Sequence, residues 1–267
     1  MSQTFFTMLF SSAFSSTIII ALAATACGFC VSSSRAEEGS AVDAEQVAKD
    51  PNAKLIRVPY EHQLDVVYGC EAVSATMALQ FYSVDITWRQ FTDEYLITKP
   101  WHVDENGECF GPDPYAAYPG NPYQDSGPNC GFGCYAPALA KAMNKVLPQD
   151  KLHAVVTSNL KLCDLVMNYI DKGEPVVMWA TMDMLPSRLT RTWTIDYVDE
   201  NSHFRLGDKF TWNGNEHCLV LVGYDAQNYF FNDPYKNHGL IAYPKELVEQ
   251  RFREQGSQSL VVQHVEQ

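Results

Sequence analysis

The sequence predicts an α+β fold in which a mostly helical first half packs on a C-terminal antiparallel sheet. Helical patterns dominate the first half of the chain and strand patterns dominate the second, and this segregation argues against an alternating parallel sheet. Hydrophobic residues make up 46% of the 267 residues and charged residues 19%, a composition typical of a folded globular chain. Residues 54–267 are long enough for one domain.

Residues 1–36 are predicted to be a separate segment. Positions 4–34 carry no charged side chain, and the apolar centre at 18–24 is followed by a small-x-small site that ends at Ala36. This pattern is typical of a secretory signal peptide. Two alternatives stay open: an uncleaved membrane anchor, because about 20 apolar residues can span a bilayer, and a lipoprotein modified at Cys27. All three place the domain outside the cytoplasm, secreted or on the cell surface.

The next elements are a linker, a strand and two helices. Residues 37–53 are polar and acidic and are interpreted as a linker without a core of its own. Residues 54–58 form a short strand before a proline. Residues 70–82 form a helix, because apolar side chains recur at four-residue spacing. A second helix extends to residue 95, with Thr87 as its N-cap.

The middle of the chain alternates irregular and regular segments. Residues 99–134 hold many Gly and Pro residues and predict a long loop, which in a compact domain is usually functional. Residues 136–146 form a helix with a proline in the first turn. A helix at 160–170 is closed by Gly173, and a buried strand follows at 175–181.

The last third of the chain is predicted to be rich in strands. Residues 183–212 look like a polar insertion that contains a hairpin. Three strands follow at 218–224, 229–232 and 240–243. A charged surface helix at 244–255 and a final strand at 259–264 complete the chain's predicted elements.

The charge balance excludes one class of function. Lys and Arg number 19 and Asp and Glu 32, which gives a formal net charge of −13. A general nucleic-acid binder needs clustered basic residues to contact phosphates, and the sequence has no such cluster. No nucleic-acid partner is therefore expected. No cofactor is expected either.

Cys70 is the first candidate for chemistry. It follows a glycine directly and begins the amphipathic helix at 70–82. Free N–H groups and the partial positive charge at a helix N-terminus favour a thiolate, which is the nucleophilic form of cysteine. The alternative is a small buried cysteine without a chemical role.

A histidine, an adjacent Asn-Asp pair and a glutamine complete a candidate catalytic set. His217 stands at the mouth of an apolar strand, and Asn232 and Asp233 follow the next strand just before a proline. A thiol needs a base, and the base needs a third group that fixes its tautomer, so a cysteine with a distant His and Asp or Asn is typical of thiol peptidases. Gln63, seven positions before Cys70, can donate to the oxyanion together with the Cys70 N–H.

The chain resembles the bacteriocin-processing type of bacterial peptidases, the family-39-like cysteine peptidases of the papain-like superfamily. The resemblance covers most of residues 55–245, and its Gly-Cys-Glu, His and Asp-Pro blocks are specific only in combination. It rests on Val58-Pro59-Tyr60, Gln63, the run from Gly69 to Leu79, Gly120-Asn121-Pro122-Tyr123, Tyr135 to Lys141, Gly173-Glu174-Pro175-Val176-Val177, His217, Val222-Gly223-Tyr224-Asp225 and Asn232-Asp233-Pro234-Tyr235.

The resemblance implies a papain-like fold, a Cys70–His217 dyad, Asp233 as the orienting residue and Gln63 in the oxyanion hole. Asp233 is preferred over Asn232 because the family pattern places its acid directly before the proline. The expected function is hydrolysis of peptide or isopeptide bonds in a peptide or protein substrate. Two alternatives stay open: acyl transfer, which uses the same dyad, and a binding module that has kept the fold.

The other cysteines are expected to be structural. Cys109, Cys130 and Cys134 lie in the long loop, and outside the cytoplasm a disulfide from Cys109 to either of the other two is the better interpretation. A zinc site is not expected, since such sites usually need four ligands. Cys163 and Cys218 are predicted to be buried on a helix and a strand.

Overall fold

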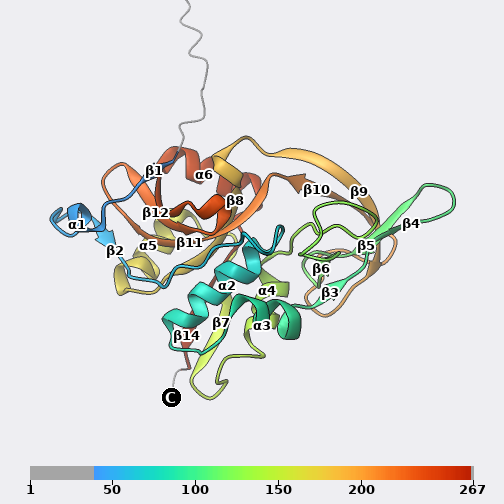
Figure 1. The fold of residues 1–267 in the computed structure, drawn as a ribbon, viewed down its shortest axis with the longest axis horizontal. Coiled ribbons are helices and arrows are strands. Elements are labelled where there is room, and N and C mark those ends of the chain that lie inside the picture. The colour runs from blue at the N-terminus through green and yellow to red at the C-terminus, as the bar shows by residue number, and fades with distance from the viewer. Residues whose placement is uncertain (1–38, 266–267) are drawn as a thin grey trace, which may run out of the picture. The chain divides into compact units, whose positions relative to one another are not determined.

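An eight-stranded sheet in which every pairing is antiparallel forms the centre of the computed structural model, which describes residues 39–265 (Figure 1). The strands lie in the order β1-β13-β12-β11-β8-β14-β7, and β2 also pairs with β11. Their bounds are Ser40–Ala41 (β1), Lys54–Leu55 (β2), Leu152–Val156 (β7), Val176–Thr181 (β8), Glu216–Tyr224 (β11), Asn228–Asp233 (β12), Gly239–Pro244 (β13) and Ser259–His264 (β14).

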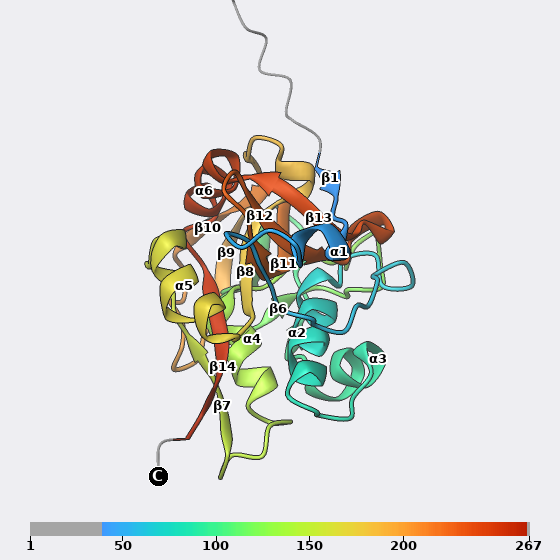
Figure 2. The same cartoon turned by 90° about the vertical axis from the view of Figure 1, so that its left-hand side faces the viewer.

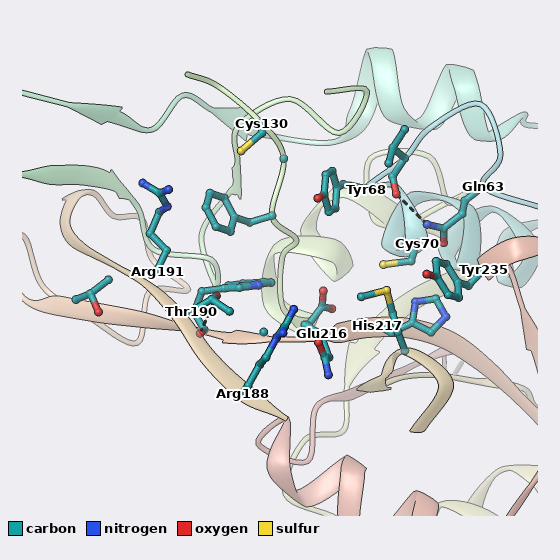
Figure 3. Close-up of a pocket in the computed structure, with 18 residues that line it drawn as sticks. Gln63, Tyr68, Cys70, Cys130, Arg188, Thr190, Arg191, Glu216, His217 and Tyr235 are labelled. Carbon is teal, nitrogen blue, oxygen red and sulfur yellow. Dashed lines mark hydrogen bonds between the residues drawn. The ribbon is translucent and has the colours of Figure 1, made fainter. Parts of the chain in front are cut away.

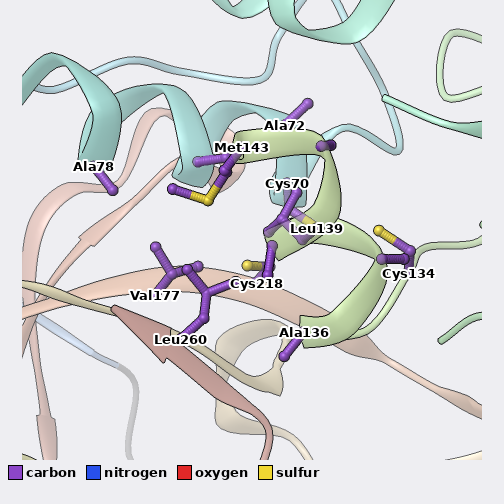
Figure 4. Packing of buried hydrophobic residues seen from close by; sticks show 14 of the residues in the cluster. Cys70, Ala72, Ala78, Cys134, Ala136, Leu139, Met143, Val177, Cys218 and Leu260 are labelled. Carbon is purple, nitrogen blue, oxygen red and sulfur yellow. The ribbon is translucent and has the colours of Figure 1, made fainter. Parts of the chain in front are cut away.

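Helices cover both faces of this sheet (Figure 2). Helices α2 (Cys70–Phe81) and α4 (Ala136–Met143) pack on one face, and α5 (Leu162–Asn168) and α6 (Lys245–Glu254) pack on the other. Figure 4 shows the first of these two cores, where Leu139 and Met143 of α4 meet Val177 and Leu260 of the sheet.

Strand β11 shows why the sequence of the central strands is an apolar run. Cys218, Val220 and Val222 face the core under α2, while Leu219 and Leu221 face the core under α6. Successive side chains of a strand point to opposite faces, so a strand covered on both sides needs apolar residues at every position. This burial fixes the strand that carries His217.

A second, four-stranded sheet stands beside the central one. The predicted hairpin is confirmed: β9 (Arg188–Tyr197) pairs with β10 (Lys209–Gly214). Two strands from the predicted long loop, β5 (Cys109–Pro112) and β4 (His102–Val103), extend this sheet, and β3 (Thr98–Lys99) pairs with β6 (Tyr118–Pro119). The loop is therefore partly ordered into short strands. Trp193, Phe210 and Trp212 form the aromatic core of this sheet.

The structure confirms the α+β fold and most of the predicted helices and strands. Thr87 caps the short helix α3 (Trp88–Gln90) through a capping box, and the helix continues as a π-helical turn, η1 (Phe91–Tyr95). Gly173 ends the turn η2 (Ile170–Lys172) with φ of 87°, a conformation that glycine adopts without a steric penalty. The strand predicted at 54–58 is shorter, and β7 was not predicted.

The described start of the chain is tied to the edge of the sheet. In the predicted linker, β1 pairs with β13 through Ser40 and Ala41, and the short helix α1 (Ala44–Val47) buries none of its residues. Main-chain pairing holds this segment in place, and Val42 and Val47 pack against the core. The predicted signal segment at 1–36 lies outside the described residues. Among residues 39–265, no helix is long and apolar enough to cross a membrane.

Candidate active site

Helix α2 begins at Cys70 and carries it into the wall of a pocket. Gly69 is the N-cap, and a Cβ at this position would lie 2.5 Å from the Val66 side chain, so the turn into the helix requires a glycine. The Ser74 hydroxyl donates to the Cys218 carbonyl at 3.0 Å and ties α2 to β11. Cys70 is buried, with 6% of its surface exposed.

His217 lies on β11 and is held by Asp233 at the end of β12. His217 Nε2 and Asp233 Oδ1 are 2.7 Å apart, and both residues are almost fully buried. Because Nε2 faces the carboxylate, Nδ1 is the ring nitrogen left for chemistry. Asp233 is thus the neighbour that contacts His217, in agreement with the choice made from the sequence.

The Asn232 side chain does not contact His217 but binds the main chain near β2. Its amide nitrogen donates to the carbonyl of Val58 at 3.1 Å and lies 3.2 Å from that of Pro59. The residues after β2 are therefore tied to β12. Adjacent strand residues face opposite sides, so only one of Asn232 and Asp233 can reach the histidine.

Asp233 is an ionised, fully bonded carboxylate. Burial raises its pKa, but the charge and hydrogen bond of His217, together with His238 and the Tyr235 N–H, outweigh burial and hold the pKa below the usual range of an aspartate. Oδ1 accepts from the Tyr235 N–H at 2.9 Å, and the Tyr243 hydroxyl lies 3.3 Å from Oδ2. This carboxylate is suited to fix the His217 ring and to stabilise its protonated form.

Cys70 and His217 line the same pocket, which has a volume of about 730 Å³. Figure 3 shows both at one end of this pocket, together with Gln63 and Tyr235. In the described geometry the Cys70 thiol donates to Glu71 Oε2 at 3.3 Å rather than to His217. Burial and the neighbouring acids raise the pKa of the thiol, which favours its protonated form. Hydrogen-bond contact between Cys70 and His217 stays a prediction.

Gln63 lies at the same end of the pocket. The side chain is buried, its Nε2 donates to the Val67 carbonyl at 3.1 Å, and its Oε1 has no hydrogen-bond partner among residues 39–265. Its backbone N–H donates to the carbonyl of Pro234, so the Gln63 segment is anchored beside Asp233. The position suits an oxyanion donor, and that role stays a prediction.

Sequence reasoning missed two buried acids beside the thiol, Glu71 and Glu216. Glu71 Oε1 accepts from the Cys134 N–H at 2.6 Å, and burial raises the pKa of Glu71 to about 7. Burial, and then the charge of Glu71, raise the pKa of Glu216 well above its usual range. The signal was present as Cys-Glu and Glu-His dipeptides, but only the fold brings residues 71 and 216 together.

The expected disulfide is not formed in the structure. Cys109, Cys130 and Cys134 are free thiols, and Cys134 is fully buried near Glu71 and Glu216. Cys109 instead lies 3.6 Å from a guanidinium nitrogen of Arg191. Cys218 is buried as expected, whereas Cys163 is exposed, which corrects the prediction that it is buried.

The aromatic residues of the loop divide between packing and the pocket. Phe132 lines the pocket and packs against Trp193 and Trp212. Trp101 is buried and its indole N–H donates to the Cys130 carbonyl. Tyr68 lines the pocket as well, next to Cys130 and Gly131.

A solved structure is similar to this chain over most of the length of both chains. It is described as a C39-like peptidase from Bacillus anthracis, with 27% identity and a TM-score of 0.64, and the match covers 80% of this chain and 98% of the other. A double-glycine-motif protease of an AMS/PCAT transporter, solved with its leader peptide, has 16% identity and a TM-score of 0.39 over 79% and 95% of the two chains. Xylellain, a cysteine protease from Xylella fastidiosa, has 14% identity and a TM-score of 0.36, and the match covers 86% of this chain and 92% of the other.

No curated protein matches the chain. The family model described as "Peptidase_C39 like family" matches residues 55–260, a span that contains Cys70, His217 and Asp233 as well as both core faces of the central sheet. The chain therefore belongs to the Peptidase_C39-like family and is a cysteine peptidase.

Proposed function

We propose that the chain is an extracytoplasmic thiol hydrolase that cleaves peptide or isopeptide bonds with Cys70 as nucleophile. The observation that carries this proposal is the buried 2.7 Å contact between His217 and Asp233 at the end of the pocket that also holds Cys70. The location outside the cytoplasm rests on the uncharged segment at 4–34.

The first step is proton transfer from the thiol to His217. The Cys70 side chain leaves Glu71 by a change of rotamer, and His217 Nδ1 accepts its proton. Asp233 stays ionised and stabilises the imidazolium, because its pKa lies below the usual range.

The second step is attack of the thiolate on the substrate carbonyl. The oxyanion that forms accepts hydrogen bonds from the Cys70 N–H and the Gln63 amide. The imidazolium then donates its proton to the leaving amine, and a thioester to Cys70 remains. Water, deprotonated by His217, resolves the thioester and restores the thiol.

A peptide-library digest tests this function. The full chain should cleave a defined set of library peptides, and Cys70→Ala should cleave none of them, because the proposed acyl-enzyme forms on the Cys70 sulfur. Mass spectrometry of the products, with and without an added amine, separates hydrolysis from acyl transfer. Equal cleavage by Cys70→Ala in a folded protein would refute the proposal.

The opposite side of the pocket indicates the charge of the substrate. Arg188 and Arg191 of β9 line the pocket and are exposed, and Figure 3 shows Arg188 extending between Thr190 and Glu216. No ion pair within residues 39–265 involves either arginine, although the chain is strongly acidic. These arginines should therefore favour substrates with a carboxylate near the scissile bond.

Substitution of the two arginines measures this preference. Arg188→Gln and Arg191→Gln should each lower kcat/KM for acidic peptides by about threefold to fivefold, because an exposed ion pair contributes roughly 0.5–1 kcal/mol. For matched peptides with Gln in place of Glu, the two substitutions should change kcat/KM little. Lys209→Gln is the control, because Lys209 lies on strand β10 of the same hairpin but does not line the pocket. Equal losses on both peptide sets would contradict an electrostatic preference.

A further inference from the structure

The buried acid Glu216 lies beside the nucleophile without a hydrogen-bond partner. Its exposed fraction is 7%, and Oε1 is unpartnered within residues 39–265. No ion pair in this part of the chain involves Glu216. A buried carboxylate without a donor is costly, so most are paired or coordinate a cation.

Three potential ligands converge at this point. One ligand atom each of Cys70, Glu71 and Glu216 lies within 4.8 Å of the others. The Cys70 sulfur and Glu71 Oε2 are already 3.3 Å apart. Around a tetrahedral zinc ion, with Zn–S of about 2.3 Å and Zn–O of about 2.0–2.2 Å, sulfur and oxygen ligands lie roughly 3.5 Å apart.

The backbone of Gly133 closes the other side of the cluster. A Cβ at Gly133 would lie 2.5 Å from Glu71 Oε1 and 2.6 Å from Glu216 Oε2, so any side chain there would displace the carboxylates. The Cys134 N–H holds Glu71 Oε1 and orients this carboxylate. Both acids are therefore fixed against one short stretch of main chain.

The cluster is open to solvent through the pocket. Cys70 and Glu216 both line it, whereas Glu71 lies behind them. Figure 3 shows the Glu216 carboxylate between Arg188 and His217, on the same side of the pocket as the thiol. An ion that enters the pocket can thus reach all three ligands, and water can fill a fourth position.

We propose that Cys70, Glu71 and Glu216 form a binding site for a thiophilic divalent cation, Zn²⁺ above all, that reversibly inhibits the enzyme. Binding converts the thiol to a zinc-bound thiolate and releases its proton, with any proton of the carboxyls, to solvent. No electron transfer occurs. The nucleophile is then blocked, and removal of the ion by a chelator restores it.

The ligand set distinguishes this site from chelation by the catalytic pair. A zinc ion held by Cys70 and His217 would require the histidine, whereas the site proposed here requires the two acids. His217 Nε2 is already engaged by Asp233, and the thiol is directed toward Glu71.

Zinc titration of the full, reduced chain tests the proposal by competition with a chromophoric chelator. Glu71→Gln and Glu216→Gln should each weaken zinc binding by about 10–100-fold or more, since loss of even an outer-sphere partner costs that much. Cys70→Ser should lose tight binding. His217→Gln, which keeps a donor for Asp233, should stay within about threefold of wild type, as should the exposed control Glu105→Gln, because neither residue is a ligand of the proposed site.

X-ray absorption of the wild-type zinc complex needs no variant and covers the case in which a substitution prevents folding. Sulfur and oxygen scattering without an imidazole signal is expected. Imidazole scattering, or loss of binding in His217→Gln but not in Glu216→Gln, would overturn the proposal. So would tight binding by Cys70→Ser, which would place the ion elsewhere. Zinc binding is measured without substrate, so it does not depend on peptide cleavage. A chain that binds zinc at this site but cleaves no peptide would refute the proposed function and leave the zinc site standing.

Discussion

Replacing His217 with alanine should lower kcat/KM for peptide cleavage by about 10²–10⁴-fold, the usual contribution of a general base. His217 lines the pocket that holds Cys70, and Asp233 engages its Nε2 and not its Nδ1. Without it, the thiol loses the base proposed to accept its proton, and because burial raises the pKa of the thiol, little thiolate forms at neutral pH.

The same substitution also affects stability, so a second variant separates the two effects. His217→Ala leaves the buried Asp233 carboxylate without its main hydrogen-bond partner, and an unpaired buried polar group costs about 1–3 kcal/mol, more when it is charged. His217→Gln keeps a donor for Asp233 but cannot act as a base. Inactive His217→Gln with a nearly normal free energy of unfolding, measured by urea denaturation, is the expected result. An active, folded His217→Gln would contradict the base assignment.

Replacing Asp233 and Asn232 should have opposite kinds of effect. Asp233→Ala should lower turnover by about 10²–10⁴-fold, because the ring of His217 loses its orientation and its counter-charge. Asn232→Ala should keep turnover but lower the free energy of unfolding by about 1–3 kcal/mol, since the carbonyls of Val58 and Pro59 lose a buried donor.

The pH profile sharpens this comparison. The pKa of Asp233 lies below its usual range, so the carboxylate is ionised in any neutral or mildly acidic assay. The stability that it contributes is present above the ordinary aspartate range and is lost only as the pH falls through the lowered pKa. Asp233 does not itself titrate near neutral pH. Any change that Asp233→Asn makes there to the pH dependence of activity should therefore come from the altered contact with His217. Loss of turnover in Asn232→Ala and not in Asp233→Ala would reverse the assignment.

The sequence predicted the elements that are long and deeply buried. Helix α2 and strand β11 are rich in apolar residues, and Cys70 and His217 stand near the starts of these elements, so the elements and the candidate residues on them could be predicted. The contact of Asp233 with His217 was predicted because adjacent strand residues face opposite sides and the family motif selects the acid.

Short and locally mixed elements could not be predicted in this way. Strand β7 leaves Val155 and Val156 partly exposed at the edge of the sheet, so its pattern lacks a regular apolar face. Strands β4 and β6 have two residues each, and their pairing partners decide their structure. Glu71 and Glu216 are far apart in sequence, and only the packing of α2 on β11 makes them neighbours of the thiol.

The most direct test of the account is the site at which a substrate-derived covalent inhibitor reacts. A peptide acyloxymethyl ketone built on the best library substrate should label Cys70, as located by peptide mapping, and His217→Gln should abolish the label. The exposed Cys163 and the partly exposed Cys109 are internal controls within the same chain and should stay unmodified. Labelling of Cys109 or Cys163 in place of Cys70, or equal labelling of Cys70 in His217→Gln, would contradict the assignment of Cys70 as a nucleophile activated by His217.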